Sequence, residues 1–165
     1  MFNKEINIFS VIVSYNPELS NLIKIIQALK LQHVNTIVVD NGTLNVEDKL
    51  RLEEISYVLK LDSNLGIAKA QNVGIEMAKS FSADYIIFFD QDSQIEEDFV
   101  KGLTFDFFNI RDKGVKLAAI GPVFTDSRYG FTIKFCILVN LGFVPNSNLK
   151  IIKNLLRLAL LFLQE

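Results

Sequence analysis

The sequence predicts an α/β fold, with a mostly parallel, Rossmann-like sheet flanked by helices. Short apolar runs rich in β-branched residues alternate with segments whose apolar residues recur at helical spacing. This alternation is typical of strand–helix–strand units, in which successive strands lie parallel. Polar residues follow each apolar run, and parallel sheets bind ligands at the carboxyl ends of their strands. We therefore expect one edge of the sheet to carry a ligand site.

The expected strands and helices follow one another in a regular order. Pro17 prevents the first strand from continuing, and Ser20 is a candidate N-cap for the helix that follows. In chain order we expect a strand at 6–13, a helix that includes 22–29, a strand at 36–39, a helix at 46–55, a strand at 57–61, a helix at 67–79 and a strand at 85–89.

The character of the chain changes after Asp126. No acidic residue occurs from Phe131 to Gln164, and lysine and arginine supply the charge there. The stretch 149–163 is a helix candidate that is apolar on nearly all sides towards its end. Such a helix can pack on the sheet or lie at a membrane surface, and both alternatives stay open. We expect a domain over residues 1–130 and an apolar, basic tail over 131–165.

Composition excludes several classes of protein. The net charge of −2 and the pI of about 5.5 argue against a nucleic-acid partner. A single cysteine, Cys136, cannot form an internal disulfide, which fits the reducing cytosol. The N-terminus has no signal-peptide cleavage pattern, and no apolar stretch reaches the roughly 20 residues that span a bilayer. We expect a cytoplasmic protein.

Two carboxylates, Asp90 and Asp92, directly follow the strand at 85–89. Residues i and i+2 of a strand point to the same side, so both carboxylates can face one ligand. Hard oxygen ligands suit Mg²⁺ or Mn²⁺, which take one or two carboxylates together with phosphate oxygens. The alternative is that Asp92 or Ser93 caps a helix, because Ser93 and Glu96 have the spacing of a capping box. The two interpretations are compatible.

Other strand ends carry polar residues of the same kind. Asp40 can accept hydrogen bonds from the base of a ligand, although Asn41 and Gly42 also fit an ordinary turn. Asn64 and Gly66 are expected near a helix N-terminus, where backbone N–H groups favour anions.

The helix expected at 67–79 carries small residues in a regular pattern. Gly66, Ala70 and Gly74 recur at intervals of four and predict a helix that lies close to the sheet. The spacing does not match a dinucleotide-binding fingerprint.

Together these segments resemble the N-terminal half of family 2 glycosyltransferases, which have the GT-A fold. The resemblance rests on "VIVSYNP", "IVVDNGT", "SNLGIAKAQNVGIEMA" and "YIIFFDQDS" and covers about residues 8–123. The form "FFDQDS" is most similar to bacterial rhamnosyltransferases of O-antigen and related polysaccharide synthesis.

The resemblance implies a nucleotide-sugar donor, for rhamnosyltransferases dTDP-L-rhamnose, and a divalent metal, Mg²⁺ or Mn²⁺. It implies inverting transfer to a saccharide or lipid-linked acceptor, with peripheral contact at the inner face of the plasma membrane. Asp92, with Asp90, would hold the metal, and Tyr15 and Asp40 would border the base. The implied donor-binding residues are Ser14, Tyr15, Asn16, Asp40, Asn41, Asn64, Gly66, Asn72, Asp90 and Gln91.

The sequence departs from the family where a general base is expected. An acceptor hydroxyl needs a positioned proton acceptor, which the family supplies from an acidic cluster that typically follows a "GG-Φ-D/E" loop. This chain has no such loop and no carboxylate from Phe131 to Gln164. We therefore expect a truncated, donor-binding part that has no identified catalytic residue and does not catalyse transfer by itself.

Two alternatives follow from the residues alone. Haloacid-dehalogenase-like phosphatases also place D-x-D after an apolar strand, so Asp90 would be the nucleophile and Asp92 the acid/base. Their motif usually follows the first strand, whereas here it follows the fourth strand candidate. The other alternative is a non-catalytic nucleotide-binding fragment.

Overall fold

The computed structural model describes residues 6–114, 117–121, 124–126, 131–133, 138–139 and 161–163. The predicted α/β order is confirmed. Up to residue 90, every strand and helix begins and ends within two residues of the expected positions, except the first helix, which is longer at its N-terminus. In chain order the elements are β1 (Ile8–Ser14), α1 (Leu19–Leu31), β2 (Asn35–Asp40), α2 (Val46–Glu53), β3 (Tyr57–Lys60), α3 (Ile67–Ser80), β4 (Tyr85–Asp90), α4 (Phe99–Asp112), β5 (Leu117–Ala119), β6 (Phe124–Asp126), β7 (Phe131–Ile133), β8 (Leu138–Val139) and β9 (Leu161–Leu163).

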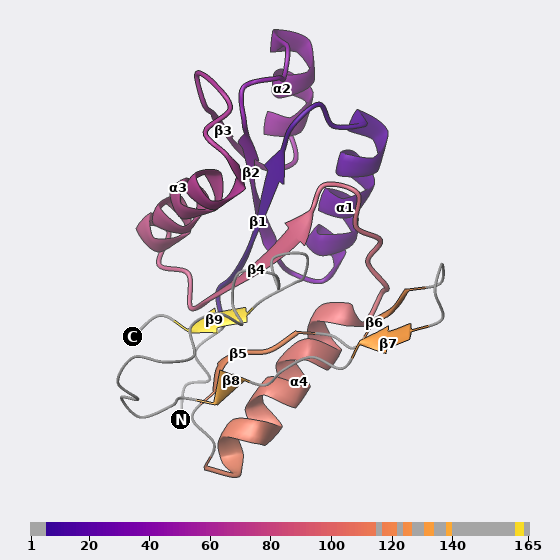
Figure 1. The fold of residues 1–165 in the computed structure, drawn as a ribbon, viewed down its shortest axis with the longest axis vertical. Helices are drawn as coiled ribbons and strands as arrows, with labels where there is room; N and C mark the ends of the chain where they lie inside the picture. Colours follow the sequence, from indigo (N-terminus) through magenta and orange to yellow (C-terminus); the bar gives the residue numbers. More distant parts are fainter. Residues whose placement is uncertain are drawn as a thin grey trace.

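The main sheet has the strand order β3-β2-β1-β4-β9. Strands β1 to β4 are parallel, and β9 pairs antiparallel with β4. Helices α1 and α3 lie on opposite sides of this sheet (Figure 1). Strands β1, β2 and β4 are buried on both faces because helices cover both faces. The prediction of a mostly parallel sheet flanked by helices is confirmed.

Alternate residues of each strand serve two separate cores. Ile12 of β1 packs with α1, α2 and α4, whereas Phe9 and Val11 pack on the side of α3. Helix α3 approaches the sheet closely because Ala70, Gly74 and Ala78 are buried beneath it. Gly66 is exposed at the N-cap of α3, so the stripe of small residues against the sheet begins at Ala70.

The first helix begins differently from the prediction. Its N-cap is Glu18, whose carboxylate accepts from the backbone N–H groups of Ser20 at 3.3 Å and Asn21 at 3.0 Å. Ser20 was wrong as the N-cap, because its hydroxyl donates to Glu18 at 2.6 Å instead. That hydrogen bond holds the pKa of the Glu18 carboxyl below its usual value.

The helix cap expected at Asp92 or Ser93 was also wrong. No helix or strand occurs between Gln91 and Asp98, and α4 begins at Phe99. The backbone of this segment turns after β4, with the Ser93 N–H donating to the Asp90 carbonyl at 3.1 Å. Ser93 therefore belongs to a turn, so the capping-box spacing has no helix to cap.

The tail prediction is contradicted at its end. Leu161–Leu163 is strand β9 and not the end of a helix, since it completes the backbone hydrogen bonds of β4 on the side away from β1. Residues 149–160 of the expected helix lie outside the described residues. Strand β7 pairs with β6 across the expected boundary at 130, and the division into two parts stays a prediction. None of the described helices has the length and apolar character needed to cross a membrane.

Candidate functional site

The polar strand ends gather at one edge of the sheet. In the parallel register Ser14 lies beside Asp40, Asp40 beside Lys60, and Val13 beside Asp90. The loops that follow these strands therefore emerge together at the carboxyl edge, where open α/β sheets bind ligands.

Gln91 joins the ends of β1 and β4. Its Oε1 accepts from the Tyr15 N–H at 2.8 Å, and its Nε2 donates to the Tyr15 carbonyl at 3.2 Å. The Gln91 side chain thus continues the backbone ladder beyond the last paired strand residues. Gln91 was expected to bind the donor; both of its polar side-chain atoms form hydrogen bonds with the neighbouring loop, and its contact with a donor stays a prediction.

The turn after β2 is held from both sides. Its Thr43 hydroxyl accepts from the Asn16 N–H at 2.8 Å, which ties it to the loop after β1. Asn41 donates to Asn64 Oδ1 at 2.9 Å and accepts from the Leu65 N–H at 2.9 Å, which ties it to the loop before α3. The loops after β1, β2 and β3 therefore form one connected rim.

Asp40 is placed differently from the expectation. It is 0% exposed, and its carboxylate accepts from the N–H groups of Thr43 at 2.9 Å and Leu44 at 3.1 Å. These hydrogen bonds are the ones expected if Asp40 stabilises an ordinary turn after β2. Direct contact between Asp40 and the base of a ligand stays a prediction, which this burial disfavours.

The remaining residues expected on the donor side differ in their access to solvent. Tyr15 is 47% exposed at the rim, and Asn16 and Asn72 are exposed as well. Ser14 is buried, and its Oγ has no hydrogen-bond partner among the described residues. Asn64 is exposed, yet its Oδ1 accepts from the Gly66 N–H at 2.9 Å and orders the start of α3.

Asp90 and Asp92 lie at the end of β4, but not on one strand face. Strand β4 ends at half-buried Asp90, and Asp92 is exposed in the turn that follows. Because Asp92 lies beyond the strand, strand alternation does not decide whether both carboxylates face one ligand, and that expectation stays a prediction.

The two carboxylates still fit a divalent metal of the kind expected. No cluster of three or more metal-ligating side chains occurs among the described residues, so the described part of the chain offers at most this pair at the end of β4. Mg²⁺ and Mn²⁺ are commonly held by one or two carboxylates and the phosphate oxygens of a substrate. The donor set thus suits a metal that binds together with a diphosphate.

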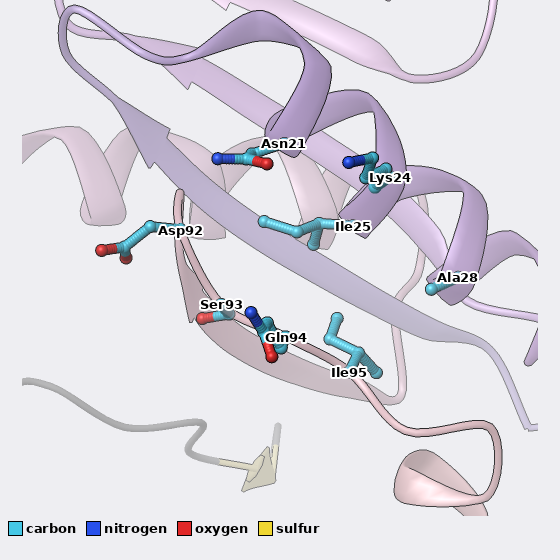
Figure 2. Close-up of a pocket in the computed structure, with 8 residues that line it drawn as sticks. All are labelled: Asn21, Lys24, Ile25, Ala28, Asp92, Ser93, Gln94 and Ile95. Atoms are coloured by element: carbon cyan, nitrogen blue, oxygen red, sulfur yellow. The ribbon is translucent and has the colours of Figure 1, made fainter. Parts of the chain in front are cut away.

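A cleft of about 330 Å³ borders Asp92. Figure 2 shows the loop residues opposite one side of α1, with the Asp92 carboxylate pointing away from that helix. The α1 residues were not predicted as part of any site, because polar positions on an amphipathic helix are indistinguishable from an ordinary solvated face. The lining residues are Asn21, Lys24, Ile25, Ala28, Asp92, Ser93, Gln94 and Ile95.

A parallel sheet with a cross-linked polar edge and a carboxylate pair defines an α/β ligand-binding domain. Residues 10–147 match the family described as Glycosyl transferase family 2. The chain belongs to this family, and the phosphatase alternative is thereby overturned.

Relatives place the chain further. It is 47% identical over 121 residues to the dTDP-rhamnosyl transferase RfbF of Shigella flexneri, a match that covers 73% of this chain. The chain spans only 39% of the length of that relative.

Solved structures of S. aureus TarS share the fold. One has a TM-score of 0.51 at 17% identity and covers 68% of this chain and 21% of that protein. TarS 1-349 in complex with UDP-GlcNAc has a TM-score of 0.52 at 18% identity, covering 68% of this chain and 33% of that one. At these identities the likeness concerns the fold alone, and the expected GT-A sheet is confirmed.

Proposed function

We propose that this chain is the donor-binding part of a glycosyltransferase that uses a nucleotide-sugar, with dTDP-L-rhamnose as the donor. The observation that carries the proposal is the connected rim of loops after β1, β2 and β3, which Gln91, between the two carboxylates at the end of β4, joins through Tyr15. The 47% identity to a dTDP-rhamnosyl transferase supports the choice of donor.

The rim residues divide into two roles in this proposal. Exposed Tyr15, Asn16 and Asn72 contact the nucleotide, whereas Asp40, Asn41 and Asn64 hold the loops that form its pocket. Ser14 adds a buried hydroxyl at the floor of the rim.

Asp90 and Asp92 would hold Mg²⁺ or Mn²⁺ together with the diphosphate of the donor. Such a metal would neutralise the charge that grows on the diphosphate as it leaves the sugar. Transfer with inversion to a saccharide or lipid-linked acceptor also requires a general base. We assign this role to neither Asp90 nor Asp92. A lipid-linked acceptor implies peripheral contact with the inner face of the plasma membrane, which flotation with liposomes tests.

Calorimetric titration with dTDP, UDP and GDP in the presence of Mn²⁺ tests donor binding. We expect dTDP to bind most tightly, and Asp92→Asn to remove most of the dependence on Mn²⁺. Asp106→Asn, an equally exposed carboxylate on α4, is the matched control and should leave binding unchanged. Equal Mn²⁺ dependence in the Asp92 variant would refute the metal assignment.

The same titration separates the proposal from its non-catalytic alternative. Binding of dTDP with Mn²⁺, followed by no release of dTDP from dTDP-L-rhamnose with any saccharide acceptor, identifies a nucleotide-binding fragment. Absence of nucleotide binding under all conditions contradicts the donor-binding proposal itself.

A further inference from the structure

The segment that carries Asp92 has little backbone structure of its own. Between β4 and α4 the backbone hydrogen bonds are local, from the Ser93 N–H to the Asp90 carbonyl at 3.1 Å and from the Phe99 N–H to the Glu96 carbonyl at 3.2 Å. Because backbone groups in such a segment make few mutual bonds, its position depends on contacts with the rest of the protein.

Gln32, at the end of α1, forms side-chain hydrogen bonds with this segment. Its Nε2 donates to the Glu96 carbonyl at 2.9 Å, and its Oε1 accepts from the Val100 N–H at 2.8 Å. The same Nε2 lies 3.3 Å from the Ala28 carbonyl. One half-buried amide thus joins the last turn of α1, the loop after Asp92 and the first turn of α4.

These bonds satisfy groups that helix ends leave without partners. The Val100 N–H lies in the first turn of α4, where no intrahelical acceptor exists. The N-cap residue Asp98 makes no side-chain cap hydrogen bond, so Gln32 supplies the missing acceptor from another helix. Val100 is buried, which makes loss of that acceptor costly.

Gln32 is itself held in place. It is the C-cap residue of α1, and its backbone N–H donates to the Leu29 carbonyl at 3.0 Å. Ile95 and Phe99 lie on either side of Glu96 in the chain, and both pack against the core that also contains α1 residues. The loop is therefore fixed against α1 along the cleft that begins at Asp92 (Figure 2).

We propose that Gln32 is a positioning residue that sets where Asp92 lies relative to the end of β4. Its side chain would thereby tune the affinity of the site for a divalent cation bound together with a nucleoside diphosphate. The metal-binding role of Asp92 in this inference rests on the proposed function. The hydrogen bonds of Gln32 with the loop do not depend on that function.

The test compares Gln32→Leu and Gln32→Glu with the wild-type chain. Leucine removes all three side-chain hydrogen bonds, whereas glutamate keeps an acceptor for the Val100 N–H and loses the donor to the Glu96 and Ala28 carbonyls. Gln27→Leu, at an exposed position of the same helix, is the matched control. Each variant is titrated with Mn²⁺ at saturating dTDP, and hydrogen exchange is followed over residues 92–100.

We expect Gln32→Leu to raise the Mn²⁺ concentration for half-saturation about tenfold, as loss of a group that orients a metal ligand commonly does. Gln32→Glu should give a smaller rise. Both variants should speed hydrogen exchange over 92–100, and Gln27→Leu should change neither measurement.

The outcomes are distinct. A lower melting temperature with unchanged Mn²⁺ dependence in both variants would make Gln32 merely structural and overturn the inference. Unchanged hydrogen exchange over residues 92–100 would refute the claim that Gln32 holds this loop in place. If the wild-type chain binds no dTDP with Mn²⁺, the proposed function and the metal part of the inference fail together, while exchange still decides whether Gln32 holds the loop. Should Gln32→Leu not fold, Gln32→Glu decides alone.

Discussion

The side-chain amide of Asn41 donates a 2.9 Å hydrogen bond to Oδ1 of Asn64, and so joins the turn after β2 to the loop before α3. Asn64 passes the connection on, since the same oxygen accepts from the Gly66 N–H at 2.9 Å. The N-terminus of α3, which favours anions, is thereby held at a set place along the rim.

Asn41→Asp should destabilise the protein. Asn41 is buried, and a carboxylate would face Asn64 Oδ1 without a hydrogen to donate. We expect a loss of about 1–3 kcal/mol in the free energy of unfolding, measured by urea denaturation. Asn35→Asp, at the exposed start of β2, is the control and should have little effect. Equal midpoints for the two variants would contradict the bridging role.

Asp40→Asn tests whether the carboxylate serves the turn. An amide carries no charge, and its NH₂ group would replace the Oδ2 that accepts a second hydrogen bond from the Leu44 N–H at 3.1 Å. Hydrogen bonds to charged groups contribute about 1.5–3 kcal/mol, and we expect a loss of this order in urea denaturation without ligand. An unchanged free energy of unfolding, combined with weaker nucleotide binding, would instead return Asp40 to the ligand-contacting role.

Gly74→Ala tests the close approach of α3 to the sheet. The added Cβ would lie 2.5 Å from Val11 Cγ1, on a stiff β-branched side chain, and we expect a loss of about 1–3 kcal/mol. Gly102 lies in α4, and among the described residues no atom beyond its own helix lies within 4 Å of an added Cβ, so Gly102→Ala should instead stabilise by up to about 1 kcal/mol. In the double variant Val11→Ala/Gly74→Ala, the loss of unfolding free energy should be smaller than the sum of the two single losses, because the clashing methyl group is gone. Strictly additive losses would argue against the clash.

Divalent metal should bind weakly in the absence of nucleotide. The described residues offer no more than the carboxylate pair at the end of β4, so most ligands must come from a diphosphate and water. Titration of Mn²⁺, with free Mn²⁺ followed by electron paramagnetic resonance, should give tight binding only when dTDP is present. Tight binding to the nucleotide-free chain would reveal a metal site elsewhere.

The stabilising effect of Glu18 should disappear in acid. Its pKa is lowered chiefly by the hydrogen bond from the Ser20 hydroxyl, so the native state binds this proton less readily than the unfolded chain. The stabilisation is present above the usual glutamate pKa of about 4.3 and is lost as the pH falls through the lower native value. Urea midpoints of wild type and Glu18→Gln should therefore differ at pH 7 and converge in acid. A constant difference would contradict the role of charge.

Much of the fold follows from local patterns. The runs that became β1, β2 and β4 are mostly apolar at successive positions, which is typical of strands covered on both faces, and each ends at a polar turn. The helix ends were harder to predict, because Glu18 and Ser20 both have side chains that can cap. The end of the tail formed β9 because the free side of β4 offered backbone partners that no local pattern reveals.

The sequence by itself determined the alternation of strands and helices and the presence of polar residues at each strand end, since both depend on the local period of apolar residues and on turn-forming side chains. Only the tertiary structure decided what each polar side chain does. Asp40 and Gln91 hold loops, whereas Tyr15 and Asp92 are exposed at the rim. Hydrogen bonds such as that from the Val100 N–H to the Gln32 side chain join residues far apart in the chain, and packing alone brings such partners within reach.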